Sequence, residues 1–341
     1  MSWVDLEGKD LLSTQYWDRS ELNAAVEAAK DLKRKYYLGE SHELLRGDTF
    51  LMLFFNSSTR TRQTFETAMS QLGGHSQYLE PGSMRVSKEQ KPGAGESIKD
   101  TAKVMSRFGE AVGIRMLEDK VSWYGEGAQI IEEFADHAEV PIIDMASDKF
   151  HPSQGLSDLF TVKEALGDDL SNKKITISWS YSPWVRSNCS IQEEALIMSR
   201  FGMDVDIAFP EGYKPDEEII DWTKENGEKY GGEINLTHDR EEALTGAHIV
   251  FPRNWMTLNR YENGVEKEKE LAAKHKDWIY TADERDDYTD NAKFMHVMPV
   301  DRGNEAEDEV VDTDSLMYDQ AENLLHMRKA ILALLVNGGL Y

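Results

Sequence analysis

Three short polar stretches of this sequence carry side chains that could hold an anion and stabilise developing negative charge. The first, residues 58–62, reads Ser-Thr-Arg-Thr-Arg and lies between an apolar run at 50–55 and a helical pattern. The free N–H groups and the positive dipole end at a helix start favour a phosphate, and Arg60 can grip two of its oxygens. Neighbouring hydroxyl groups add donors, namely Ser58, Thr59 and Thr61. Alternatively, this stretch only caps the helix and its two arginines are solvated surface groups.

The second stretch is His-Pro-Ser-Gln at 151–154, just after an apolar run at 140–145. His151 can donate to a developing oxyanion, and Gln154 can accept from an amide. A lone His-Pro in a loop can equally be structural. Arg115 ends another apolar run and should point into the same crevice as the first stretch.

The third stretch is His-Val-Met-Pro at 296–299, followed closely by Arg302 and Gly303. It follows the last apolar run, and Gly303 permits a tight backbone there. Alone it would be an ordinary loop.

Several kinds of site have no counterpart in the sequence. There is no Gly-x-Gly-x-x-Gly after a strand, no phosphate-binding Gly-x-x-x-x-Gly-Lys and no His-Glu-x-x-His. One cysteine, Cys189, excludes an internal disulfide framework and a multi-cysteine metal site. We therefore expect no metal and no cofactor.

The elements that must position these stretches alternate between strands and helices. Short apolar runs occur at 50–55, 111–116, 140–145, 175–179, 205–209, 248–251, 278–281 and 294–298. Runs of this kind are typical of strands buried on both faces of a parallel sheet, and amphipathic helical patterns lie between them. We predict an α/β fold with two doubly wound parallel-sheet domains that divide near residue 150, and a last helix at about 319–336.

The composition bounds the partners. The chain has 341 residues and a formal net charge of −25, which disfavours nucleic acid or an anionic membrane as a partner. No apolar run is long enough for a membrane span, and the start does not resemble a signal peptide, so we expect a cytoplasmic protein. Arginines that cluster in so acidic a chain need a reason.

Taken together and in this order, the three stretches resemble the aspartate/ornithine carbamoyltransferase family. Further matching segments are 95–101, 157–159 and 318–323, so the resemblance runs through nearly the whole chain. It implies that one domain, 1–150 plus the returning C-terminal helix at 320–341, binds carbamoyl phosphate, and that 151–319 binds the amino acceptor. The residues it assigns to carbamoyl phosphate are Ser58, Thr59, Arg60, Thr61, Arg115, His151, Gln154 and Arg302.

The resemblance also implies small-molecule substrates and an oligomeric enzyme. Members of the family form homotrimers, or dimers of trimers, with active sites between subunits. By resemblance, a loop from the neighbouring subunit that contains Lys88 and Gln90 would close over the phosphate.

The acceptor side departs from the standard family patterns. Val297 replaces the cysteine of His-Cys-Leu-Pro, and residues 251–257 lack the aspartate of the ornithine-gripping stretch. The Trp-x-Tyr-x-Pro at 179–183 and the Pro-x-x-Trp at 252–255 look more like the knotted transcarbamylases, which include acetylornithine and ureidoglycine enzymes. The candidate acceptor contacts are Arg186, Asn188, Gln192, Arg253, Asn254, Trp255, His296, Met298 and Pro299.

Two extra arginines in this set favour an acceptor that bears a carboxylate. Ureidoglycine, an intermediate of purine catabolism that would be converted reversibly to allantoate, is the first named hypothesis. The alternatives are a divergent ornithine or N-acylornithine carbamoyltransferase and a non-catalytic paralog that binds carbamoyl phosphate.

Overall fold

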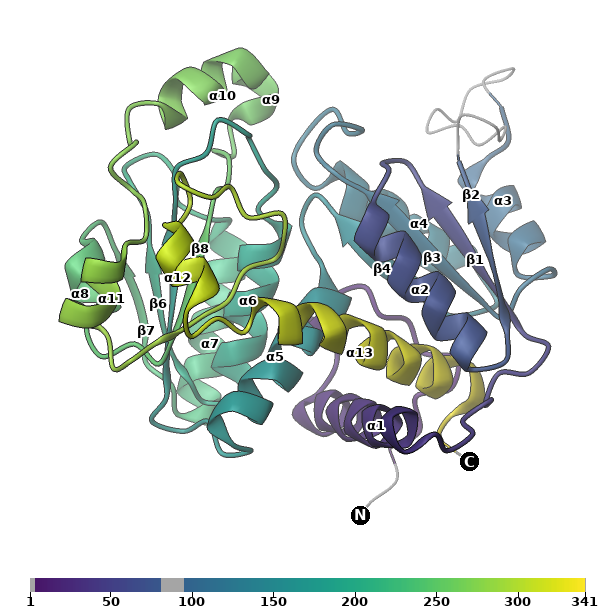
Figure 1. The fold of residues 1–341 in the computed structure, drawn as a ribbon. Helices are drawn as coiled ribbons and strands as arrows, with labels where there is room; N and C mark the ends of the chain where they lie inside the picture. Colours follow the sequence, from purple (N-terminus) through teal and green to yellow (C-terminus); the bar gives the residue numbers. More distant parts are fainter. Residues whose placement is uncertain (1–3, 81–94, 341) are drawn as a thin grey trace. The chain divides into compact units, whose positions relative to one another are not determined.

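The computed structural model describes residues 4–80 and 95–340, which form two compact units (Figure 1). The first comprises the chain up to Phe160 together with the residues from Glu322 onward, and the second spans Thr161–Ala321. Each contains one parallel sheet, so the predicted α/β fold is confirmed. The C-terminal helix returns to the first unit, as expected, whereas the division at Phe160 falls inside a helix rather than before it. The knot stays a prediction.

The first unit contains a four-stranded sheet in the order β2-β1-β3-β4. Its strands are β1 Thr49–Phe54, β2 His75–Leu79, β3 Ala111–Met116 and β4 Ile142–Ser147. Its helices are α1 Arg19–Leu38, α2 Thr59–Gln71, α3 Ile98–Met105 and α4 Glu126–His137, preceded by a 3-10 turn at Thr14–Tyr16. Two helices contain the division between the units, α5 Pro152–Leu166 and α13 Met317–Asn337.

The direction in which successive strands are added to this parallel sheet changes between β1 and β3. The crossover from β1 to β2 goes one way and those from β2 to β3 and from β3 to β4 go the other. Since such crossovers are right-handed, α2 covers one face, and α3 and α4 cover the opposite face (Figure 1). The carboxyl ends of β1 and β3 therefore form a switch point, where α/β sheets bind ligands.

The second unit contains a five-stranded sheet in the order β7-β6-β5-β8-β9. Its strands are β5 Lys174–Trp179, β6 Asp204–Ala208, β7 Ile234–Thr237, β8 Ile249–Arg253 and β9 Lys293–Phe294. Its helices are α6 Cys189–Arg200, α7 Glu217–Tyr230, α8 Arg240–Leu244, α9 Arg260–Asn263, α10 Val265–Ala272, α11 Ala282–Tyr288 and α12 Asp308–Asp312.

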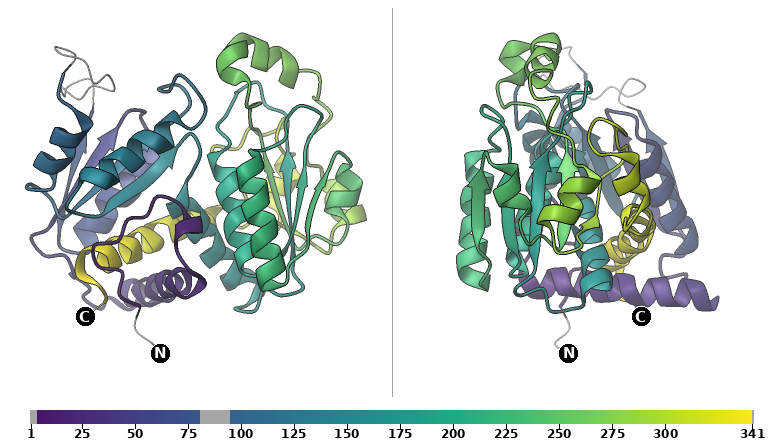
Figure 2. Two further views of the ribbon diagram at one scale, coloured as in Figure 1. Left: turned by 180° about the vertical axis from the view of Figure 1, so that it is seen from behind. Right: turned by 60° about the vertical axis from the view of Figure 1, so that its left-hand side comes forward.

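A second switch point lies between β5 and β8. Helices α6 and α7 pack together on one face of this sheet (Figure 2), while the connection from β7 back to β8 runs through α8 in the reverse direction. The neighbours β5 and β8 pair in parallel up to Trp179 and Arg253. The loops that follow these two strands are thus brought to one place.

The sequence analysis missed two strands and proposed one that is not formed. The missed strands, β2 and β7, are the outer strands of their sheets and mix polar with apolar residues, so they lack a continuous apolar run. The predicted strand at 278–281 is wrong, because only Tyr280 pairs there, in an isolated bridge with Ala306.

Buried apolar side chains stabilise the arrangement of the first unit. Val112 and Ile114 of β3 cluster with Ile131 and Phe134 of α4, and each such side chain contributes about 1.5–3 kcal/mol by leaving water. In the described part of the chain, no helix combines the length and apolar character that a bilayer crossing requires.

Candidate active site

The Ser-Thr-Arg-Thr-Arg stretch lies at the switch point of the first unit. It forms the start of α2, and the Ser58 hydroxyl caps the helix by accepting from the backbone N–H of Thr61 at 3.3 Å. The capping role considered as an alternative is therefore real, and it is compatible with anion binding, because the positive dipole end at a helix start favours an anion. Arg60, half-buried, extends from the same turn.

Arg115 lies beside this turn on the adjacent strand. It pairs in register with Phe54 at the end of β1, and its carbonyl accepts from the N–H of Phe55 at 2.9 Å. The register therefore places the Arg115 backbone beside the start of α2, and the predicted direction of its side chain stays a prediction.

A third arginine, Arg328 of α13, joins this cluster, and the sequence analysis missed it. It is 1% exposed, donates to the hydroxyls of Thr64 and Ser153, and has its guanidinium carbon 4.5 Å from the centre of the Phe65 ring. Burial and the positive charges of Arg115 and Arg60 lower the pKa of Arg328 to about 9. Arg60, Arg115 and Arg328 thus lie close enough to influence one another's charge, which makes this end of the sheet a candidate anion site.

His151 and Gln154 occupy the start of α5, after the adjacent strand β4. Both are buried, and the Gln154 amide nitrogen donates to Asp158 at 2.7 Å. This bond orients the amide and leaves its oxygen as an acceptor. Since β1, β3 and β4 are neighbours, the sheet brings the loops after all three to one edge.

Two other arginines are engaged elsewhere. Arg62 is exposed, pairs with Glu66 at 2.8 Å and has its guanidinium carbon 4.0 Å from the centre of the Tyr78 ring. Arg302 pairs with Asp308 at 2.9 Å and Asp312 at 2.7 Å. Its predicted contact with carbamoyl phosphate stays a prediction.

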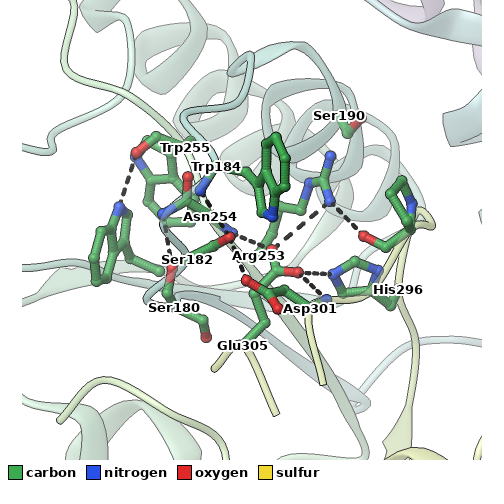
Figure 3. A network of polar contacts seen from close by, with 12 residues as sticks. Ser180, Ser182, Trp184, Ser190, Arg253, Asn254, Trp255, His296, Asp301 and Glu305 are labelled. Atoms are coloured by element: carbon green, nitrogen blue, oxygen red, sulfur yellow. Dashed lines mark hydrogen bonds and ion pairs between the residues drawn. The ribbon is translucent and has the colours of Figure 1, made fainter. Parts of the chain in front are cut away.

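In the second unit, a buried polar network surrounds Glu305 (Figure 3). This fully buried carboxylate accepts from the backbone N–H groups of Asn254 at 2.9 Å and Asp301 at 2.7 Å. It also lies 3.2 Å from Nε2 of His296 and 3.7 Å from Nη1 of Arg253. Glu305 was not among the predicted site residues. Its position as a carboxylate shortly after His-Val-Met-Pro was the available signal.

The charges of this network are balanced internally. Burial alone would raise the pKa of Glu305, but His296, Arg253 and the backbone donor outweigh it and lower that pKa to about 2. Burial lowers the pKa of His296 despite the adjacent carboxylate. Glu305 therefore stays ionised and fixes both partners.

The loop after β5 and the start of α6 contribute further polar groups. Asn188 precedes α6, is fully buried, and its side-chain amide has no hydrogen-bond partner among the residues described. Arg186 is half-buried, and its carbonyl accepts from the N–H of Met256. Gln192 is buried within α6, where its carbonyl oxygen faces the N–H of Asp216 at 3.4 Å.

Comparison with known proteins identifies this combination of fold and site. Residues 9–164 match the family described as aspartate/ornithine carbamoyltransferase, carbamoyl-P binding domain. Residues 184–335 match the Asp/Orn binding domain of the same family. The chain belongs to the aspartate/ornithine carbamoyltransferase family. It is therefore a carbamoyltransferase, as the resemblance implied.

Curated relatives of this carbamoyltransferase align over nearly their full lengths. The ornithine carbamoyltransferase of Pyrococcus abyssi is 36% identical, with 98% of each chain covered. The N-acetylornithine carbamoyltransferase of Xanthomonas campestris pv. campestris is 34% identical, with 96% of this chain and 98% of the relative covered. A crystal structure of acetylornithine transcarbamylase complexed with acetylcitrulline superposes with a TM-score of 0.90 at 32% identity, covering 96% of this chain and 99% of that one.

Not every predicted acceptor contact of the carbamoyltransferase is open to solvent. Trp255 is fully buried and its indole N–H donates to the Tyr213 carbonyl at 2.7 Å, so it supports the wall of the unit. Met298 is half-buried and Pro299 is exposed, and a cis peptide bond joins them. Contact of these residues with the acceptor stays a prediction.

Two further predictions concern the loop with Lys88 and Gln90 and the absence of a metal site. Lys88 and Gln90 lie outside the described residues, so their role stays a prediction. No group of acidic, histidine or cysteine side chains suited to a metal occurs within 4–80 and 95–340.

Proposed function

We propose that this carbamoyltransferase transfers the carbamoyl group between carbamoyl phosphate and the amino group of a small acceptor that carries a carboxylate and is neither aspartate nor ornithine. The observation that carries the proposal is the network of the second unit. Its arginine is Arg253, with Arg186 nearby in the same unit, while both of its carboxylates, Glu305 and Asp301, already accept hydrogen bonds within the unit. Such a site attracts a carboxylate and offers little to the α-ammonium group of ornithine.

The residues of the first unit suit the chemistry of carbamoyl phosphate. The helix start with Ser58, Thr59, Arg60 and Thr61 would bind the phosphate, and Arg328 adds a fixed positive charge. Arg115 and His151 would donate to the carbonyl oxygen, and the amide oxygen of Gln154 would accept from the substrate amino group.

Transfer follows from these positions. The acceptor nitrogen attacks the carbamoyl carbon, the new N–C bond forms, and the C–O bond to phosphate breaks with its electron pair leaving on phosphate. The acceptor nitrogen gives up one proton, which the departing phosphate can take. Cationic donors fixed around the tetrahedral oxyanion and the leaving group lower the barrier.

Ureidoglycine remains the first named acceptor in this proposal. It carries one carboxylate and, apart from the reacting amine, no other ammonium group, which fits the two arginines and the engaged carboxylates. N-Acetylornithine is the second candidate, supported by the similarity to acetylornithine transcarbamylases, whose acceptor also has its α-amino group acylated. A non-catalytic role is disfavoured because Arg60, His151 and Gln154 are all present.

The assembly proposed with this function is a homotrimer in which the loop with Lys88 and Gln90 serves a neighbouring copy. Sedimentation equilibrium would test it, with three times the 38.9 kDa chain mass expected. A monomer that retains full activity would contradict it.

An acceptor panel tests the function itself. Purified protein with carbamoyl phosphate would be given L-ornithine, N-acetyl-L-ornithine, ureidoglycine and L-aspartate in turn, and carbamoylated product would be detected by mass. We expect product from ureidoglycine or N-acetyl-L-ornithine, each of which carries a carboxylate and no ammonium group besides the reacting amine. Turnover of L-ornithine alone would contradict the proposal.

A further inference from the structure

An exposed indole stands in the middle of a loop that is anchored by buried polar residues. Residues 180–188 connect β5 to α6, and Trp184 in the middle of this loop is 66% exposed, whereas Ser180, Ser182 and Asn188 are each at most 2% exposed. Apolar side chains that are this exposed at a site rimmed by polar groups commonly contact a ligand.

The loop is fixed on both sides of Trp184. The backbone N–H of Trp184 donates to the Ser182 hydroxyl at 3.1 Å, and that hydroxyl donates to the Asp301 carboxylate at 2.7 Å (Figure 3). On the other side, the Arg186 carbonyl accepts from the N–H of Met256 at 3.0 Å. The indole is therefore presented to solvent on a fixed backbone and does not owe its exposure to a loose chain.

The same loop borders the buried network around Glu305. The N–H of Ser180 donates to the Arg253 carbonyl at 2.9 Å, and the side-chain amide of Asn254 donates to the Ser180 carbonyl at 3.0 Å. Asp301, which holds the loop through Ser182, also donates its N–H to Glu305. The loop that carries Trp184 and the strand that carries Arg253 are thus joined by hydrogen bonds.

We infer that Trp184 determines acceptor specificity: its indole covers the uncharged amide or ureido group of the acceptor, whose carboxylate binds at the arginines. The inference rests on the proposed function and deepens it. A flat apolar ring packs well on a planar amide. A second ammonium group at that position would lie near two guanidinium groups with no open carboxylate of the network to pair with.

Kinetics of Trp184→Ala and Trp184→Phe would test this role. With N-acetyl-L-ornithine and ureidoglycine as acceptors, we expect Trp184→Ala to raise the acceptor KM about tenfold and Trp184→Phe to restore most of the loss. The KM for carbamoyl phosphate and kcat should change less than about twofold. Tyr318→Ala is the matched control, since Tyr318 is 65% exposed in the same unit, and it should leave all three constants unchanged.

The outcomes separate this inference from the function on which it rests. If the wild type transfers carbamoyl to these acceptors but Trp184→Ala keeps the same acceptor KM, the role of Trp184 is refuted and the function stands. An equal loss with carbamoyl phosphate and the acceptor also refutes it, because that indicates general damage to the loop. If the wild type carbamoylates no acceptor, the function and the inference both fail.

Discussion

The guanidinium groups of Arg60, Arg115 and Arg328 are held near one another although they repel. Folding imposes this arrangement: burial, and next the charges of Arg115 and Arg60, lower the pKa of Arg328 to about 9. An anion bound among them relieves the repulsion, so ligand binding and stability are linked.

The first prediction is therefore that inorganic phosphate stabilises the protein and that Arg60→Ala abolishes this effect. We expect saturating phosphate to raise the Tm by about 2–4 °C, equivalent to about 1 kcal/mol. Differential scanning fluorimetry with and without phosphate measures it. Arg62→Ala is the control, because Arg62 starts the same helix but pairs with Glu66. An equal phosphate response in both variants would remove Arg60 from the anion site.

Glu305 gives the second residue-scale prediction. Glu305→Gln removes the charge between His296 and Arg253 and sets an amide N–H group against backbone N–H donors. We expect the acceptor KM to rise at least tenfold and the free energy of unfolding to fall by about 2–4 kcal/mol. Steady-state kinetics and urea unfolding measure the two effects. An unchanged acceptor KM in the folded variant would deny Glu305 its positioning role.

Helix α13 brings residues near the C-terminus to the first unit. It places Arg328 in the anion site and buries the next residue, Lys329, completely. The Lys329 ammonium lies 3.4 Å from Nε2 of His42 and 5.1 Å from the centre of the Tyr36 ring.

The third prediction concerns the pH dependence that Lys329 gives to stability. Burial lowers the pKa of Lys329 from 10.5 to about 8. Between these values the unfolded chain binds more protons, so stability should rise with pH across the window, and the cost should be fully present below pH 8. Relative to Lys329→Met, the wild type should gain on the order of 1–3 kcal/mol. Urea unfolding from pH 7 to 10 tests this, and parallel pH profiles would contradict it.

Local signals in the sequence were enough to predict the elements that position the first site. Residues 58–62 do begin a helix at the end of a strand. Arg328 could not be found this way, because its partner Thr64 lies 264 positions earlier and only the fold brings them together. Its position in a largely buried helix was the one available hint.

The second unit shows the same limit. Arg253 and Asn254 were proposed from the family resemblance, and His296 from its place after the last predicted strand. The pairing of β8 with β5 and β9 explains why the segments after these strands meet. That Glu305 joins them depends on the path of the loop after His296, which no pattern in the sequence determines.

At the scale of the whole molecule, the formal net charge of −25 contrasts with the arginines gathered at the two sites. Arg60, Arg115 and Arg328 are buried or half-buried near one another, and in the second unit Arg253 pairs with Glu305. Acidic groups at the two sites, such as Asp158 and Glu305, are engaged in local hydrogen bonds, so the negative net charge does not oppose anion binding beside the arginines.

A competition experiment tests which acceptor this carbamoyltransferase uses. Equal concentrations of L-ornithine, N-acetyl-L-ornithine and ureidoglycine would be mixed with carbamoyl phosphate and the wild-type protein, and the initial product ratio would be measured by mass spectrometry. That ratio gives the relative kcat/KM values. We predict that allantoate or N-acetylcitrulline exceeds citrulline by at least about a hundredfold. Citrulline as the dominant product would contradict the account.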